Sequence, residues 1–229
     1  MPPVRSGKKL TPEQVRTLKA WVNQGAPWSA HWAFVPPKRP ATPTVKGDGN
    51  VNNSIDAFVV AHLEKRNLAP SPRAPKEILI RRVTLDLTGL PPTAQEVDAF
   101  LADDQPQAYE RLVDRLLASP AFGERWGRHW LDVARYAESS GKETDFAYPH
   151  AWRYRDYVIR AFNADKPYDQ FVWEHIAGDT LPSPRRHPVE GFNESLIGTG
   201  FFWLGQQSHS PVDVRGYQSD LIDNQIEIG

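Results

Sequence analysis

The sequence predicts a mostly α-helical fold: a multi-helix array with a short N-terminal helix and a proline-rich linker. Apolar residues recur at spacings of three and four over most of the chain after residue 53. Helix-start signals, in which a capping residue precedes the apolar series, stand before several of these segments. No segment has a strand pattern of comparable quality, although 197–204 is short, apolar and ambiguous.

The first predicted helix begins after Thr11 and stops at Gly25. Thr11 can cap it, Pro12 suits the first helical position, and Gln14 completes a capping box. From residue 26 to 53, five prolines and a Gly/Asp/Asn stretch indicate an extended linker. We expect its aromatic residues to anchor it on a neighbouring surface: Trp28, His31, Trp32 and Phe34.

We therefore divide the chain into an N-terminal segment over 1–28, a Pro/Gly-rich linker over 29–53 and a helical domain over 54–229. In that domain, Thr93 and Glu96 form another capping box. The predicted helices cover 54–66, 76–86, 93–101, 107–117, 120–139, 151–162 and 168–176, with a further helical stretch after 212.

The composition excludes several classes of protein. The formal net charge of −1 argues against a generally basic nucleic-acid-binding protein. No apolar run is long enough to cross a membrane. The chain has no cysteine, so it holds no disulfide, no cysteine-ligated metal, no cysteine nucleophile and no covalently attached haem c.

The helix predicted over 120–139 carries the candidate site. Its apolar side is expected to comprise Trp126, Trp130, Val133 and Ala137, joined by Leu131 and Ala134. The other side collects three arginines, a histidine and an aspartate, with Glu138 just beyond: Arg125, Arg128, His129, Asp132 and Arg135.

Two interpretations of this side of the helix remain open. His129 and Asp132 are three residues apart and Arg128 and Asp132 four apart, so these side chains can touch. The simpler interpretation is a solvated helix surface laced with weak ion pairs. Alternatively, the arginines bind an anionic ligand between Trp126 and Trp130, or His129 acts as a general base that Asp132 orients.

The alternating basic and aromatic residues over 152–157 allow nucleic-acid or carbohydrate binding, but we favour a core role for the aromatic residues. No zinc-protease, nucleophile-elbow or phosphate-loop motif is present.

Several stretches carry a resemblance to a known family. They read AFGERWGRHWLDVARYAESSGKETD and WRYRDYVIRAFNADKPYDQFVWEHIAGDTLP, preceded by IDAFVVAHLEKRNLAPSP and LIRRVTLDLTGLPPTAQEVDAFLAD. Together they resemble large multidomain planctomycete proteins that join a planctomycete cytochrome c domain to domains of unknown function. The stretch KLTPEQVRTLKAWVNQGAPW looks like the tail of that cytochrome domain.

The resemblance implies that 1–28 is a C-terminal remnant of the cytochrome domain. Met1, ahead of Pro2 and Pro3, is similar to the axial iron ligand of such a domain, a role it could have only in an intact parent domain. The family carries Cys-x-x-Cys-His motifs on both sides of this stretch, so we expect the chain to be a fragment between them. No cofactor is then expected in this chain, and haem c belongs to the full-length parent. The resemblance also implies a periplasmic or other extracytoplasmic location.

Three functions follow as hypotheses. The first is an accessory module linked to haem and electron transfer, which binds the neighbouring cytochrome domain, a redox partner, a polysaccharide or another anionic ligand. The second is an enzyme for an anionic or carbohydrate substrate, with His129 as base, Asp132 as its orienter and the arginines as anion clamps. The third is a structural fragment whose function depended on its missing ends.

Overall fold

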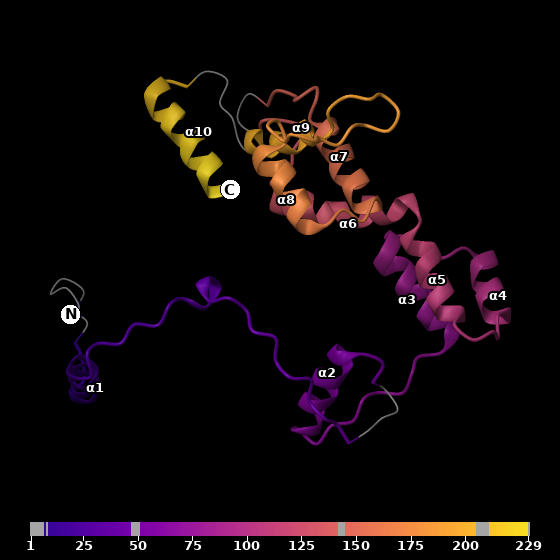
Figure 1. The fold of residues 1–229 in the computed structure, drawn as a ribbon, viewed down its shortest axis with the longest axis horizontal. Coiled ribbons are helices and arrows are strands. Elements are labelled where there is room, and N and C mark those ends of the chain that lie inside the picture. Colours follow the sequence, from indigo (N-terminus) through magenta and orange to yellow (C-terminus); the bar gives the residue numbers. More distant parts are fainter. Residues whose placement is uncertain (1–6, 8, 47–50, 142–144, 205–210, 229) are drawn as a thin grey trace. The chain divides into compact units, whose positions relative to one another are not determined.

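The computed structural model describes residues 7, 9–46, 51–141, 145–204 and 211–228. It is 56% helical, and the described residues contain no strand, which confirms the predicted mostly α-helical class. The chain forms two compact units, Met1–Pro72 and Arg73–Gly229. Figure 1 shows the helices of both. No helix among the described residues has the length and apolar character needed to cross a membrane.

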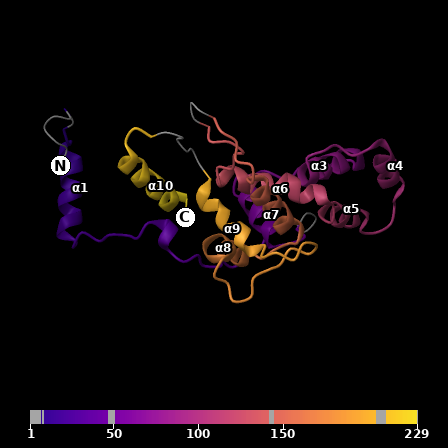
Figure 2. The ribbon, with the colours of Figure 1, turned by 90° about the horizontal axis from the view of Figure 1, so that it is seen from above.

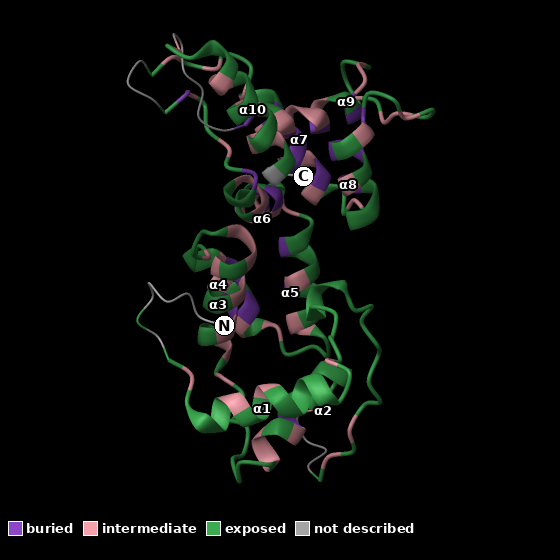
Figure 3. Ribbon diagram, turned by 90° about the vertical axis from the view of Figure 1, so that its left-hand side faces the viewer, coloured by how far each residue is buried: buried purple, intermediate pink, exposed green. Residues whose placement is uncertain are grey.

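The first unit has little core of its own. It contains α1 (Pro12–Asn23), the short 3-10 helix η2 (Trp32–Phe34) and α2 (Ser54–Glu64). The predicted capping box of Thr11 and Gln14 is present at the start of α1. No residue of α1 is buried (Figure 3). Trp28, one of the expected anchors, is 87% exposed, and Trp32 and Phe34 are also exposed.

The second unit begins with three helices around a small apolar core. They are α3 (Lys76–Thr88), α4 (Ala94–Ala102) and α5 (Ala108–Leu117). Ile80, Phe100, Leu112 and Leu116 are buried between them. The predicted capping box of Thr93 and Glu96 starts α4. These helices pack because each turns its apolar stripe to the same centre.

The larger core of this unit lies among the helices that follow. They are α6 (Pro120–Val133), α7 (Trp152–Asn163), α8 (Tyr168–Ala177), α9 (Ser195–Gly198) and the 3-10 helix η3 (Thr199–Trp203), with α10 (Val214–Ile228) after them. Helix α6 lies between the group α3–α5 and helix α7 (Figures 1 and 2). The segment 197–204, ambiguous in sequence, is helical up to Trp203.

The helix predicted over 120–139 is shorter than expected. It ends at Val133, because Arg135 takes a left-handed φ of +56° that no helix can continue through. Its predicted apolar side is only partly right: Ala134 is buried and Trp130 and Leu131 pack against the larger core, whereas Val133 is 74% exposed. The contact with α7 also runs through Gly123 and Gly127, which the prediction did not include. A Cβ at Gly123 would stand 2.4 Å from the carbonyl oxygen of Ile159. Small residues therefore decide how closely α6 and α7 approach.

Candidate functional site

The predicted catalytic residues lie on the exposed surface of α6. Arg128, His129 and Asp132 are exposed, whereas Arg125 is half-buried. Nη1 of Arg125 donates to Nε2 of His129 over 3.1 Å. The Asp132 carboxylate makes no hydrogen bond or ion pair with a described residue. The structure thus brings His129 to Arg125, and not to Asp132.

This contact bears on what His129 can do. A general base needs a free lone pair directed at the substrate. A guanidinium has only donors, so Nε2 of His129 accepts a hydrogen bond from Arg125. Neither His129 nor Asp132 lines any of the hollows described below. The arrangement suits His129 to orienting Arg125.

Arg125 faces α3 rather than the other arginines of its own helix. With Arg81 and Arg82 of α3 it lines an open hollow of about 540 Å³. The remaining lining residues are Val83, Leu85, Asp86 and Tyr109. We call this site the arginine hollow. Three positive charges here face one carboxylate, that of Asp86.

The arginines of the hollow have no carboxylate partners in the part of the chain that the structure describes. None of Arg81, Arg82 and Arg125 forms an ion pair with a carboxylate of the described residues. A guanidinium presents several N–H groups in a planar fork that matches carboxylate, sulfate and phosphate groups. The hollow therefore has the charge and the donors to hold an anion.

Gly89 decides how closely Arg125 approaches α3. It ends that helix with a left-handed φ of +75°. A Cβ on Gly89 would stand 2.9 Å from Cδ of Arg125. The arginine stem thus passes over the C-terminal end of α3. The last carbonyl groups of a helix carry partial negative charge, which favours a cation at this position.

The two tryptophans predicted to flank a ligand lie partly inside the protein. Nε1 of Trp130 donates to the hydroxyl of Tyr154 over 2.9 Å, and that hydroxyl donates to Nε2 of His175 over 2.9 Å. Nδ1 of His175 donates to the carbonyl of Phe171 over 2.7 Å. Burial lowers the pKa of His175, which favours its neutral form. Trp130 thus belongs to a buried hydrogen-bond chain. Trp126 is half-buried, and its ring centroid lies 5.3 Å from that of His129.

The remaining predicted residues lie apart from the arginine hollow. Arg135 is exposed just beyond the end of α6. Glu138 accepts hydrogen bonds from the hydroxyl of Tyr136 over 2.9 Å and from Nη1 of Arg155 over 2.7 Å. Met1, the proposed iron ligand, lies outside the described residues.

The sequence prediction missed Arg81 and Arg82. Asp86 follows Arg82 by four residues, a spacing that predicts a helical ion pair and so suggests a neutralised surface. In the structure that ion pair is not formed. Nothing local indicates that α6 brings Arg125 beside them, because the contact joins residues far apart in the chain.

The residues of this chain do not fit haem c. Its covalent attachment needs cysteine thiols, and the sequence contains none. The described residues also contain no group of three or more His, Cys, Asp or Glu side chains placed to hold a metal ion.

The fold and the arginine hollow define a mostly α-helical domain with a cationic surface site. The model of the family PSCyt2, described as "Protein of unknown function (DUF1549)", matches residues 54–228. The chain belongs to this family. No curated protein and no solved structure matches it.

Proposed function

We propose that this chain is an accessory binding module of a cytochrome-c-associated protein, and that the arginine hollow holds the acidic surface of a partner. The observation that carries the proposal is the convergence of Arg81, Arg82 and Arg125 from two helices on one hollow, where none of them pairs with a described carboxylate. Its candidate partner is a neighbouring cytochrome domain or another redox protein. The resemblance to planctomycete multidomain proteins supports this choice and an extracytoplasmic location.

Electrostatics favours an acidic partner here. Like charges near each other repel, and an arriving carboxylate relieves that repulsion while it gains charge-assisted hydrogen bonds. Tyr109 adds an aromatic side chain to the lining, and aromatic residues and arginine are enriched at protein interfaces. Because the hollow is open to water, the attraction is expected to weaken as salt concentration rises.

We do not propose the enzymatic alternative built on His129 and Asp132. Nε2 of His129 meets a donor from Arg125, and the carboxylate of Asp132 makes no contact with the imidazole. No observation in the described residues favours that function over binding.

The test is a calorimetric titration of the chain with a hexaglutamate peptide, with a neutral hexaglutamine peptide as reference. The triple variant R81A/R82A/R125A is compared with R16A/R128A/R135A, which loses the same charge from exposed arginines outside the hollow. We expect the first variant to bind about tenfold more weakly or worse, and the second to bind within about threefold of the unaltered chain. Equal losses in both variants, or equal binding of the neutral peptide, would overturn the proposal.

A further inference from the structure

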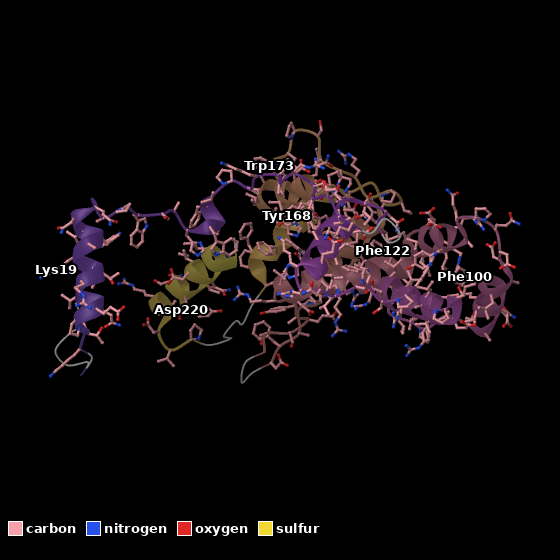
Figure 4. The ribbon with its side chains drawn as sticks, turned by 90° about the horizontal axis from the view of Figure 1, so that it is seen from below. Lys19, Phe100, Phe122, Tyr168, Trp173 and Asp220 are labelled. Atoms are coloured by element: carbon pink, nitrogen blue, oxygen red, sulfur yellow. The ribbon has the colours of Figure 1, made fainter. Side chains whose placement is uncertain are left out.

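A second pocket, formed by different helices, lies against α8. Its volume is about 700 Å³. Helix α8 contributes Gln170, Trp173 and Glu174, and the segments on either side contribute Lys166, Ser183 and Arg185. Figure 4 labels Trp173 and Tyr168, both on this helix. We call this site the α8 pocket.

The acid that lines the α8 pocket is fully engaged. Glu174 is buried; its Oε2 lies 2.5 Å from Nζ of Lys166 and accepts from the hydroxyl of Tyr157 over 2.6 Å. Its Oε1 accepts from the hydroxyl of Ser195 over 2.9 Å. Burial opposes ionisation of Glu174, but the hydrogen bonds from these three groups outweigh it and hold the pKa of the carboxyl below its usual range. Glu174 is therefore ionised and has little capacity left for a ligand.

The cations of the pocket have fewer hydrogen-bond acceptors than they have donors. Nη1 of Arg185 donates to Glu194, but the same carboxylate also takes Nε of Arg160 at 2.5 Å. Nη2 of Arg185 is buried and has no hydrogen-bond partner among the described residues. The guanidinium carbon of Arg185 lies 5.5 Å from the ring centroid of Tyr157. Nε of Arg185 also lies 3.5 Å from Oε1 of Glu174, so that Lys166, Arg185 and Arg160 share two carboxylates, and a buried N–H group is left over.

Lys166 gives a second reason to expect an anionic ligand. Its side chain is only 6% exposed, and burial lowers the pKa of its ammonium group. A buried cation that shares its one carboxylate with other donors is stabilised when a further anion comes close. The excess positive charge of the pocket is therefore a physical reason for an anionic ligand.

Trp173 indicates a second property of the ligand, an apolar face. Its side chain stands beside the pocket and is 61% exposed, although burying an indole is favourable. An exposed indole face offers a flat apolar platform, and the amide of Gln170 and the hydroxyl of Ser183 offer donors and acceptors next to it. A sugar ring has the matching chemistry: an apolar face of C–H groups and a rim of hydroxyls.

We propose that the α8 pocket binds an acidic sugar, one that carries a carboxylate or a sulfate. The sugar ring stacks on Trp173, and its anionic group faces the excess positive charge of Lys166 and Arg185. This proposal is independent of the arginine hollow, because the two sites share no residue.

The test uses the unaltered chain and three oligosaccharide probes of similar length: trigalacturonate, a sulfated galactose trisaccharide and uncharged galactotriose. Binding is followed by calorimetry and by tryptophan fluorescence. We expect at least one anionic probe to bind about tenfold more tightly than galactotriose. The two anionic arms distinguish a carboxylate ligand from a sulfate ligand. Equal affinity for the neutral sugar, or no binding of either anionic sugar, would overturn the proposal.

Two exposed tryptophans, one in the pocket and one outside it, allow a test variant and a matched control. Trp173→Ala should weaken binding of the anionic sugar about tenfold, whereas Trp203→Ala, 68% exposed and outside this pocket, should leave it unchanged. Circular dichroism checks that both variants fold. If Trp173→Ala binds like the unaltered chain, or if hexaglutamate competes with the sugar as well as free sugar does, the pocket is not a sugar site. The variant R81A/R82A/R125A should keep its sugar binding, so failure of one proposal leaves the other open.

Discussion

The arginine hollow and the α8 pocket use the same kind of residue in opposite ways. In the hollow, three guanidinium groups line an open surface and form no ion pair with a described carboxylate. In the α8 pocket, Arg185 and Lys166 are paired with carboxylates, and both Glu174 and Glu194 are buried. The unpaired charges of the hollow are available to a partner, whereas the paired charges of the α8 pocket also stabilise the fold.

This difference leads to opposite expectations for mutations. Removing one member of a buried ion pair leaves an uncompensated charge, which typically costs about 3–5 kcal/mol. Removing an unpaired surface charge changes the free energy of unfolding by less than about 0.5 kcal/mol. Stability measurements alone can therefore test whether the two sets of charges differ in this way, before any ligand is known.

The largest effect is expected for Glu174→Ala. The substitution leaves Lys166 without its carboxylate and removes the acceptor of Tyr157 and Ser195. We expect the free energy of unfolding, measured with urea, to fall by about 3–5 kcal/mol. The control is Glu138→Ala, which removes an exposed partner of Arg155 and should cost less than about 1 kcal/mol. Similar costs for both variants would mean that the network under α8 is no more important than a surface pair.

A second, smaller effect is expected from acid. The folded-state pKa values of Glu174 and His175 are both lowered from their usual values of 4.5 and 6.5. The unfolded chain therefore binds these protons more readily than the folded chain does. The free energy of unfolding should fall as the pH drops below about 6.5 through His175, and further below about 4.5 through Glu174.

Urea titrations across this pH range test the assignment. Glu174→Gln should flatten the lower part of the profile, because glutamine does not titrate. R81A/R82A/R125A should keep the profile of the unaltered chain, since arginine stays charged throughout. An unchanged lower limb in Glu174→Gln would show that other carboxyl groups cause the acid dependence.

A still smaller change in stability is expected when the three arginines of the arginine hollow are replaced by alanine. The free energy of unfolding of R81A/R82A/R125A should stay within about 0.5 kcal/mol per substitution of that of the unaltered chain, because no described carboxylate loses an ion-pair partner. The same variant should lose most of its binding to hexaglutamate. A large loss of stability would indicate that the three arginines are structural and would argue against a docking role.

The smallest effect is expected for His129→Ala. Its contact with Arg125 is exposed, so stability should change by less than about 0.5 kcal/mol. Because the imidazole orients that arginine, hexaglutamate should bind about two- to threefold more weakly. Asp132→Ala serves as the control and should change neither quantity. An equal effect of both substitutions would favour the paired role first predicted for them.

Much of the helical framework could be predicted from local signals. The capping boxes at Thr11 and Thr93 formed as expected, and the helices up to α8 lie within a few residues of their predicted limits, except at the end of α6. The candidate site was only partly predictable. Arg125 was identified, but its partners Arg81 and Arg82 lie on another helix, and Glu174 was not recognised as the centre of a charge network.

The sequence by itself determined where most helices begin, because caps and apolar spacing act within a few residues. It also excluded covalent haem attachment, which depends on residue type alone. The tertiary structure alone decided that Gly123 and Gly127 form the contact of α6 with α7, and which charges are paired. Pairing depends on distances between segments that are remote in the chain, such as those that carry Arg160 and Glu194. Those distances are set by packing, which no local pattern encodes.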